Sequence, residues 1–546
     1  MKNLKYILYS LALLAFVACN EPIDILEEQG IDTTVVQLPA LSAGSADFST
    51  YVSLGNSLTA GFTDNALFRA SQENSFPNIL AQKFSMLGGG NFTQPMMNDN
   101  VGGLLLAGNP IISPTSGNRL FAPRLVFGGA GPVPLQSINP GAESSTDFAL
   151  NNPTGPFNNM GVPGASSFHL IAPGYGNIAN FPAAANPYFI RMTGATPNAS
   201  IMEMAMAQSP SFVTLWVGAN DVLGYATGGA SSGAPTPQPT FDFAMSQIMS
   251  ALGGTQGVVA NVPYVTDIPY FTTVPHNPLD PSNPSFGPLI PTLNGIFSQL
   301  NQVYAFLGVP ERSIDFSQTS ASAVVIKDES LTDLSAQITG VLNASPTFPA
   351  FVQSFGLPAA AAPMVANLFG LTYGQTREAN ENDLLVLPSS TIIGTVNDDS
   401  VAFLMGQGLP PALAGQFSVE GISLPLADNW VVIPSEQDEI RMAIDGYNAT
   451  IQAAASTAGM AFVDANGIFQ QMAAGGYTDG DFTFTADLVF GGAVSLDGVH
   501  PTSRGYALIA NEFMKAIDAT YDSNFEASGN LVNVGDYPTN YSHLLQ

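Results

Sequence analysis

The chain has 546 residues, of which 42 are acidic and 13 are basic, and this gives a formal charge of −29 at pH 7. Such an excess of negative charge argues against nucleic acid as a partner and against electrostatic adhesion to anionic lipid. Charged residues make up only 10% of the chain, whereas glycine and proline number 53 and 41, so we expect a surface rich in small polar residues and loops. The length allows several domains, but the sequence contains no repeat and no second set of motifs.

The first 18 residues have the features of a secretory signal peptide. Lys2 and Lys5 precede the apolar run Ile7–Val17, which is short for a membrane-spanning helix. The run leads to Cys19, the only cysteine of the chain, and it resembles a bacterial lipoprotein signal in which Cys19 becomes the lipidated N-terminus. The alternative is an ordinary signal peptide with a chance cysteine, but a lone cysteine at this junction has little other use.

Residues 19–47 read as a tether between this anchor and the fold. The tether begins with the acidic segment Asn20–Glu28, which resembles the tethers of lipoproteins exposed on bacterial surfaces; a plain solvated linker is the alternative. The sequence therefore predicts a lipid-anchored protein of the bacterial cell envelope. We expect it at the outer membrane, on either the periplasmic or the external face.

The first expected strand, Tyr51–Leu54, ends in Gly55-Asn56-Ser57-Leu58-Thr59. A serine at a strand-to-loop turn lined by small residues can expose its hydroxyl and act as a nucleophile. The alternative is a serine that only shapes the turn.

Two later segments offer hydrogen-bond donors. Asn159–Ser166 is a turn-rich loop in which Gly164 can present its backbone N–H. Phe212–Val217 reads as a buried strand, and it ends in Gly218-Ala219-Asn220-Asp221. Asn220 could instead be an Asx-turn residue, and Asp221 fits a role in turning the chain better than a role in a reaction.

Near the C-terminus, Asp497-Gly498-Val499-His500-Pro501 places a carboxylate and an imidazole three residues apart, just before a helical segment. The chain has only four histidines, and His500 is the one in a motif with a catalytic interpretation. A base held by a carboxylate needs a nucleophile, and Ser57 is the candidate.

Taken in order, Ser57, Gly164, Asn220 and the pair Asp497 and His500 resemble the four sequence blocks of the SGNH (GDSL-type) hydrolases. Each motif alone is weak, but four in the family's order form a specific signal. The resemblance implies that Ser57 attacks an ester carbonyl, that His500 transfers the proton and that Asp497 orients the imidazole. It also implies an oxyanion hole made of the backbone N–H groups of Ser57 and Gly164 and the side-chain amide of Asn220.

One residue departs from the family pattern. The first block reads Gly-Asn-Ser-Leu, with Asn56 where the family usually has aspartate. In the family that aspartate is mostly a turn residue, and asparagine keeps its side-chain carbonyl. We therefore expect activity to survive.

Buried strands at 257–262 and Met460–Asp464 alternate with amphipathic helices. Glu439–Ala455 has one apolar face, and Ser435 can cap it. The last helix presents an apolar face made of Tyr506, Ile509, Phe513 and Ile517. The alternation predicts an α/β fold with a mostly parallel sheet. The family resemblance makes this the flavodoxin-like three-layer α/β/α sandwich, with active residues at the carboxyl ends of the strands.

Asn220 and Asp497 are 277 positions apart, far more than one or two strand–helix units require. We therefore expect a large, largely helical insertion over about 275–430, with helical pieces at Leu293–Leu307, Leu331–Leu342 and Phe351–Leu368. A second insertion, rich in glycine and proline, covers about 101–140. The hydrolase domain then spans 48–525, and 526–546 forms a C-terminal tail. The insertions are either a lid or groove wall, or surface decoration.

We expect no cofactor and no metal. No spacing of histidine, cysteine and aspartate suits zinc, and Asp479-Gly480-Asp481 has too little around it for calcium. The leading interpretation is a lipid-anchored serine esterase or lipase, whose ester substrate is a lipid, a small ester or an acetylated carbohydrate. The alternatives are a carbohydrate acetyl esterase and a non-catalytic binding lipoprotein that keeps the fold.

Overall fold

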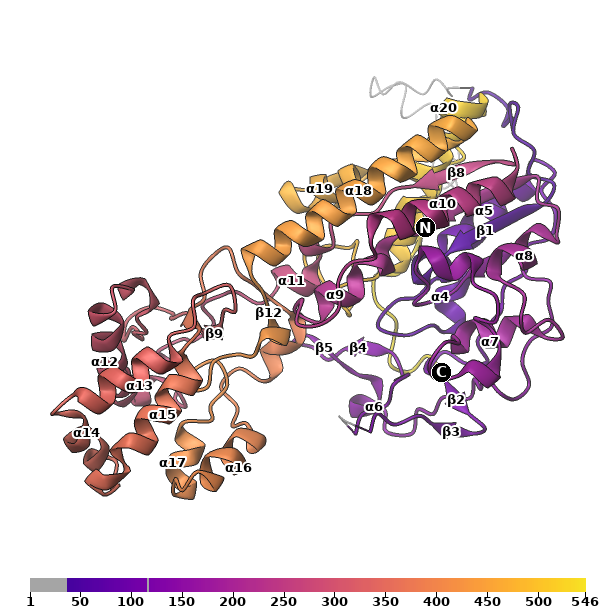
Figure 1. Cartoon of the computed structure of the whole chain (residues 1–546). Helices are drawn as coiled ribbons and strands as arrows, with labels where there is room; N and C mark the ends of the chain where they lie inside the picture. The colour runs from indigo at the N-terminus through magenta and orange to yellow at the C-terminus, as the bar shows by residue number, and fades with distance from the viewer. Residues whose placement is uncertain (1–36, 115–116) are drawn as a thin grey trace, which may run out of the picture.

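A computed structural model describes residues 37–114 and 117–546, so the signal peptide, Cys19 and most of the tether lie outside the described residues. The centre of the fold is a five-stranded sheet in the order β13-β8-β7-β1-β6 (Figure 1). All of its strand pairs are parallel. The expected α/β fold with a parallel sheet is therefore confirmed. The strands are β1 (Tyr51–Gly55), β6 (Asn159–Gly161), β7 (Phe212–Trp216), β8 (Gln256–Ala260) and β13 (Ala461–Val463).

The strand order creates a crevice at one edge of the sheet. Numbered along the chain, the five strands lie in the order 2-1-3-4-5, and the order reverses between β1 and β7. Loops after these two strands leave toward opposite sides and open a binding crevice at their carboxyl ends. Gly55 pairs with Gly161 on one side and with Trp216 on the other, so three strands end at the same level. Ser57, Gly164 and Asn220 follow these three ends.

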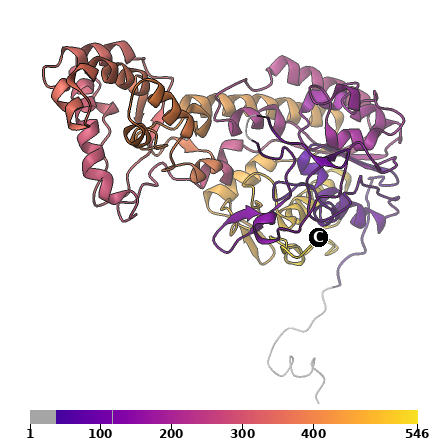
Figure 2. The ribbon, with the colours of Figure 1, turned by 90° about the horizontal axis from the view of Figure 1, so that it is seen from below.

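Helices cover both faces of the sheet, which explains why β1 and β7 are buried along their whole length. On one face, α10 (Gln238–Leu252) and α18 (Pro434–Ala458) pack on a core that includes Leu54 and Leu215. On the other face, α5 (Phe76–Ser85) and α20 (Ser503–Tyr521) pack on a core that includes Phe212 and Trp216 (Figures 1 and 2). The sheet is thus enclosed in an α/β sandwich.

The two long helices of the C-terminal part begin in different ways. α20 follows Thr502, whose hydroxyl accepts the N–H of Gly505 at 2.9 Å. α18 begins at Pro434, so the expectation that Ser435 caps it is wrong, because Ser435 already lies inside the first turn. Proline suits the first helical position, where its missing N–H is not needed. Glu436 closes this end instead, by accepting the N–H of Ile433 at 2.8 Å.

Residues 275–430 fold around an apolar core of their own. In Figures 1 and 2 this part projects away from the sheet, and α18 leads the chain back to it. At its centre the buried Tyr304 hydroxyl donates to the carbonyl of Tyr373 at 2.7 Å. Its helices are α12 (Ile290–Phe306), α13 (Ser335–Ala344), α14 (Phe348–Ser354), α15 (Ala362–Tyr373), α16 (Asp398–Gly406) and α17 (Pro411–Gln416), and its strands are β9 (Val325–Lys327), β10 (Thr376–Glu378) and β11 (Leu384–Leu385), which pairs with β12 (Val431–Val432).

One expected helix of this insertion is wrong as a single element. Phe351–Leu368 is divided between α14 and α15, which meet at a bend of 113°. Gly356 adopts a φ of 77° at the break and Pro358 follows, so the first helix cannot continue. Within the described part of the chain, no single helix has the length and apolar composition to cross a membrane, although this bent pair meets both criteria together.

The second insertion and the C-terminal tail pack together. Residues 101–140 contain two short hairpins, β2 (Leu105–Leu106) with β3 (Asn109–Pro110) and β4 (Leu125–Phe127) with β5 (Pro132–Pro134). Beside them the buried guanidinium of Arg124 donates to the carbonyls of Ser542 at 2.7 Å and Leu545 at 3.0 Å. The tail is therefore fixed to the fold by a charged side chain from the insertion.

Candidate active site

Ser57 is the first residue of a short helix, α3 (Ser57–Ala60), directly after β1. The side chain of Asn56 accepts the N–H of Leu58 at 3.0 Å and so caps this helix. This is a turn-forming role that a neutral carbonyl oxygen fulfils, and Asn56 is only 1% exposed, where a charge would be costly. The asparagine in the first block therefore has a structural use at this position.

The structure brings Ser57, His500 and Asp497 together. Ser57 Oγ lies 2.9 Å from His500 Nε2, and His500 Nδ1 lies 2.8 Å from Asp497 Oδ2. Residues 443 positions apart in the sequence thus form one continuous hydrogen-bonded series. A hydroxyl, an imidazole and a carboxylate in this sequence of contacts are the parts of a nucleophile with its base and orienting acid.

Five donors hold the carboxylate of Asp497. Oδ1 accepts the backbone N–H groups of Val499 and His500, each at 2.9 Å, and the hydroxyl of Ser495 at 3.0 Å. Oδ2 faces the ring of His500 and accepts the N–H of Asn65 at 2.9 Å. Burial raises the pKa of Asp497, but the charge and hydrogen bonds of His500 and the backbone N–H groups outweigh it and lower this pKa to about 2. The acid is therefore ionised at neutral pH.

Asp64 and Asn65 form a tight turn against this acid, which the sequence analysis missed. Their φ values are 52° and 64°, and the turn is closed by hydrogen bonds between Thr63 and Ala66. Two consecutive left-handed residues make a type I′ turn, for which aspartate and asparagine are favoured. An Asp-Asn pair was thus the available sequence signal, although nothing in it indicated that Asp497 would be the partner.

Asp64 is itself an unusual group. Its Oδ1 accepts the N–H of Leu496 at 3.1 Å, while its buried Oδ2 has no partner among the described residues. Burial raises the pKa of Asp64 to about 7, and the nearby charge of Asp497 adds to this effect. Asp64 thus holds its proton well above the range usual for a carboxyl group.

The expected oxyanion donors lie on adjacent loops. The Asn220 amide nitrogen donates to the carbonyl of Ala165 at 3.0 Å, and the Ser166 hydroxyl donates to the carbonyl of Asn220 at 3.1 Å. Gly164 adopts a φ of 83°, which favours glycine. These contacts fix the Asn220 side chain against the Gly164 loop, beside the end of β1.

The other polar candidates have structural roles. Asp221 accepts the N–H of Ser167 at 2.8 Å and its hydroxyl at 2.7 Å, and so joins two loops. His169 accepts the N–H of Ser166 at 3.0 Å and stacks on Tyr175, with ring centroids 4.3 Å apart. Burial lowers the pKa of His169 to about 4, so this ring is neutral at pH 7.

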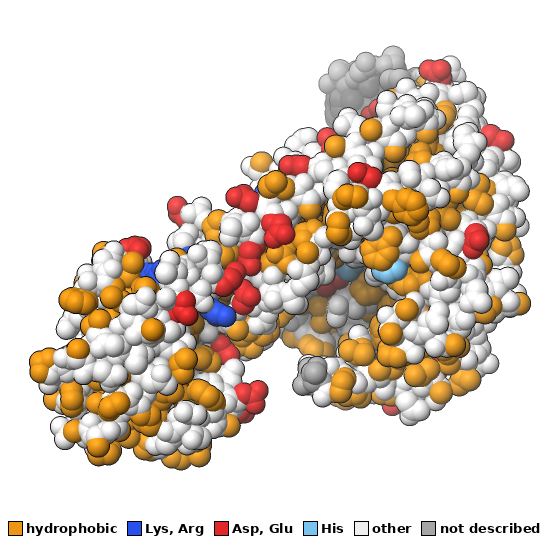
Figure 3. Space-filling model, in the orientation of Figure 1, with side chains coloured by type: hydrophobic (Ala, Val, Ile, Leu, Met, Phe, Trp, Pro, Cys, Tyr) orange, Lys and Arg blue, Asp and Glu red, His pale blue; other side chains and the backbone are white. Residues whose placement is uncertain are grey.

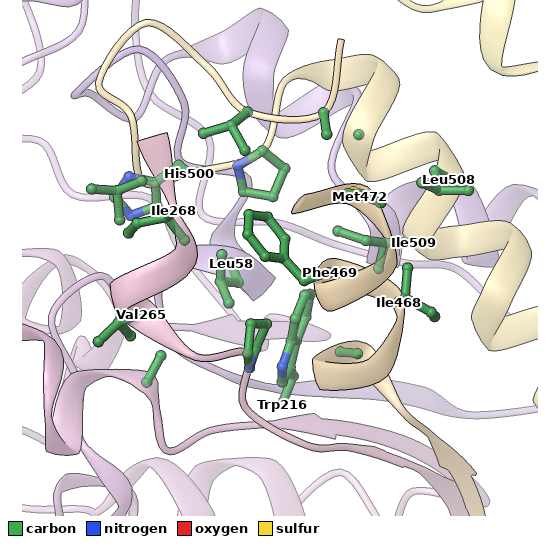
Figure 4. Close-up of a pocket in the computed structure, with 18 of the residues that line it drawn as sticks. Leu58, Trp216, Val265, Ile268, Ile468, Phe469, Met472, His500, Leu508 and Ile509 are labelled. Atoms are coloured by element: carbon green, nitrogen blue, oxygen red, sulfur yellow. The ribbon is translucent and has the colours of Figure 1, made fainter. Parts of the chain in front are cut away.

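An apolar cavity of about 120 Å³ opens beside Ser57, Asn220 and His500. Figure 4 shows it running from His500 past Leu58 and Trp216 to two helices of the C-terminal part, α19 (Ala465–Ala474) and α20. The side chains at that far end are Ile468, Met472, Leu508 and Ile509.

An acidic cluster lies away from this site, where the insertion joins α18. Ligand atoms of Glu329, Asp428 and Glu436 lie within 4.8 Å of one another, and this is the group within the described residues whose geometry could hold a metal ion. Figure 3 shows a row of acidic side chains at this junction. Burial, with the repulsion between these carboxylates, raises the pKa of Glu436 to about 8 and that of Asp428 to about 6. The cluster shares no residue with the Ser57 site.

Comparisons with protein-family profiles, with curated proteins and with solved structures found no match to this chain.

Proposed function

We propose that the chain is a serine hydrolase that cleaves carboxylic esters through an acyl-enzyme on Ser57. The observation that carries this proposal is the series Ser57, His500 and Asp497, with separations of 2.9 Å and 2.8 Å between the reacting atoms. A turn serine and a helix-start histidine need no such alignment. The acid at the end of the series is also ionised and held by five donors, as an orienting group requires.

The reaction follows from these positions. Ser57 Oγ attacks the ester carbonyl while His500 Nε2 removes its proton, and Asp497 stabilises the imidazolium that forms. His500 then gives the proton to the alcohol, which leaves, and a water molecule activated by the same imidazole releases the acid. The negative charge on the carbonyl oxygen needs donors, for which the backbone N–H groups of Ser57 and Gly164 and the amide of Asn220 are the candidates.

The same proposal includes the family and the place of action. The strand order 2-1-3-4-5 is that of flavodoxin-like sheets, and Ser57 and Asn220 follow the two strands where the order reverses. Together with the four ordered motifs, this supports an SGNH-type hydrolase with a three-layer sandwich. The leader ending at Cys19 supports a lipid-anchored enzyme of the bacterial envelope.

A fluorophosphonate probe, which labels activated serines, tests the proposal. Wild type should be labelled and should hydrolyse p-nitrophenyl acetate, and Ser57→Ala should lose both properties. Ser246→Ala, which alters an exposed serine of α10, is the matched control and should retain both. If the probe still labels Ser57→Ala, the nucleophile is another residue.

A further inference from the structure

The apolar cavity beside Ser57 has a floor made of buried side chains. Trp216, Leu508 and Phe513 are at most 4% exposed, and Leu58 and Phe469 lie between them and the catalytic groups. Ser57, Asn220 and His500 line one end of the cavity, and the half-buried Ile468 and Ile509 line the other. The cavity therefore receives whatever group is attached to the carbon that Ser57 attacks, and it encloses that group as the group extends away.

The polar groups in the inner walls already have partners. The indole N–H of Trp216 donates to the carbonyl of Asn261 at 2.9 Å. Glu512, the charged residue in the lining, accepts a hydrogen bond from Lys515 at 2.7 Å. A sugar hydroxyl placed there would lose its water without gaining a partner, at a typical cost of about 1–3 kcal/mol. A hydrocarbon chain has no such cost and gains by leaving water.

The order of events selects the acyl half of the ester for this cavity. The acyl group stays bonded to Ser57 after the alcohol has left, and a water molecule must then reach the same carbon. A group held in the cavity can remain bound during both steps. The alcohol must leave and the water must enter, so both need access from the solvent side of His500. The acyl chain is therefore the half that fits inside.

The volume indicates the length of that chain. A water-sized group needs roughly 10–15 Å³ of such a cavity. The volume of about 120 Å³ is several times that, so the cavity has room for a chain of several carbons rather than for an acetyl group alone.

We propose that this cavity is the acyl-binding site and that the enzyme prefers medium-chain acyl esters over acetyl esters. This inference rests on the proposed hydrolase function, and it identifies the substrate class. Each methylene buried is worth about 0.8 kcal/mol, so kcat/KM should rise about fourfold per methylene until the cavity is full. Between butyrate and octanoate the expected gain is on the order of 100-fold.

The first experiment measures kcat/KM for p-nitrophenyl acetate, butyrate, octanoate and palmitate. We expect a maximum near octanoate. Ile509→Trp narrows the far end of the cavity, so it should lower the octanoate-to-acetate ratio at least tenfold. Phe469→Ala widens the cavity and should move the maximum toward palmitate, which keeps the test informative if Ile509→Trp does not fold. Met442→Trp, at an exposed position on α18, should leave the profile unchanged.

The second experiment measures binding without turnover. Trp216 and Trp430 are the two tryptophans of the chain, so in Trp430→Phe the fluorescence reports on Trp216 alone. Decanoate should quench this fluorescence in a saturable way, also in the double variant that combines Trp430→Phe with Ser57→Ala. Acetate should not quench it. A flat or acetate-preferring profile in an enzyme that the fluorophosphonate labels would overturn the acyl-site inference while the hydrolase function stands. If wild type shows neither labelling nor ester turnover, the function on which the inference rests is refuted instead.

Discussion

Replacing Asp497 by asparagine should disable the base while leaving the nucleophile in place. The amide group must put its NH₂ where one carboxylate oxygen was. At the Oδ1 position it would oppose the N–H groups of Val499 and His500, which cannot reverse. At the Oδ2 position it opposes one backbone N–H and the ring Nδ1, and the ring can become an acceptor by moving its proton to Nε2.

The second arrangement is less costly, and it produces the wrong tautomer. A protonated Nε2 facing Ser57 Oγ at 2.9 Å cannot take the serine proton. In serine-protease triads this defect lowers kcat by roughly 10⁴, which corresponds to ~5 kcal/mol of barrier. We expect a loss of that order in kcat for Asp497→Asn, with a much smaller change in KM.

The assay is the hydrolysis of p-nitrophenyl octanoate, with the rate of fluorophosphonate labelling as a second readout. Both should fall together, because both depend on deprotonation of Ser57. Asp481→Asn changes an exposed turn residue and serves as the charge-matched control, for which we expect wild-type rates. A loss of less than tenfold in Asp497→Asn would refute the argument, because another group would then have to orient His500.

Two further predictions concern a buried charge and the anchor. Asp64 has a pKa of about 7 in the folded chain against an ordinary value of 3.8, so its contribution to stability is fully present below pH 3.8 and is lost as pH rises through 7. Asp64→Asn keeps the Oδ1 acceptor, so its free energy of unfolding should exceed that of wild type by up to about 4 kcal/mol at pH 8 and should not exceed it at pH 3.5. Urea unfolding measures both values. An equal gain at the two pH values would contradict this prediction. Cys19→Ala should move the protein from the membrane to the soluble fraction, because a single unlipidated tether has no acyl chains to insert, and a mutant that still sediments with membranes would argue against lipidation.

The sequence predicted those parts of the fold that depend on local pattern. The buried strands around Val52, Val213 and Val259 are short apolar runs, and each is found in the sheet. The face of α20 formed by Phe513 and Ile517 follows the helical period, and both side chains are fully buried. The sequence motifs alone indicated Ser57, Asp497 and His500, and the structure places these three side chains in contact.

What the sequence could not supply is contact between distant segments. Asp497 accepts hydrogen bonds from the Ser495 hydroxyl and from the backbone N–H of Asn65. Because every residue except proline has a backbone N–H, the second contact cannot be recognised from residue type. Part of the cavity wall comes from α19 and α20, whose apolar residues look in the sequence like ordinary core positions. The break between α14 and α15 was open to prediction, because Gly356 and Pro358 both oppose a continuous helix.

The large insertion reaches the loop that carries Asp497, which its length alone did not indicate. Within the described residues, the lining of the cavity at Ser57 includes none from 275–430, whereas α19 and α20 both contribute to it. The segment that precedes the insertion nevertheless contacts the loop that carries Asp497, because the carbonyl of Gly498 accepts the N–H of Tyr270 at 3.0 Å. A Cβ at Gly498 would lie 2.9 Å from that nitrogen and 3.2 Å from the Leu387 side chain, and Gly498 has a φ of 75°. The loop carrying Asp497 therefore packs against Tyr270 and against Leu387 of the insertion, and Asp497 also accepts a hydrogen bond from the turn at Asn65. These contacts help to hold Asp497 at hydrogen-bond distance from His500. We therefore expect the insertion to affect the proposed reaction through the position of this loop rather than through contact with an acyl chain.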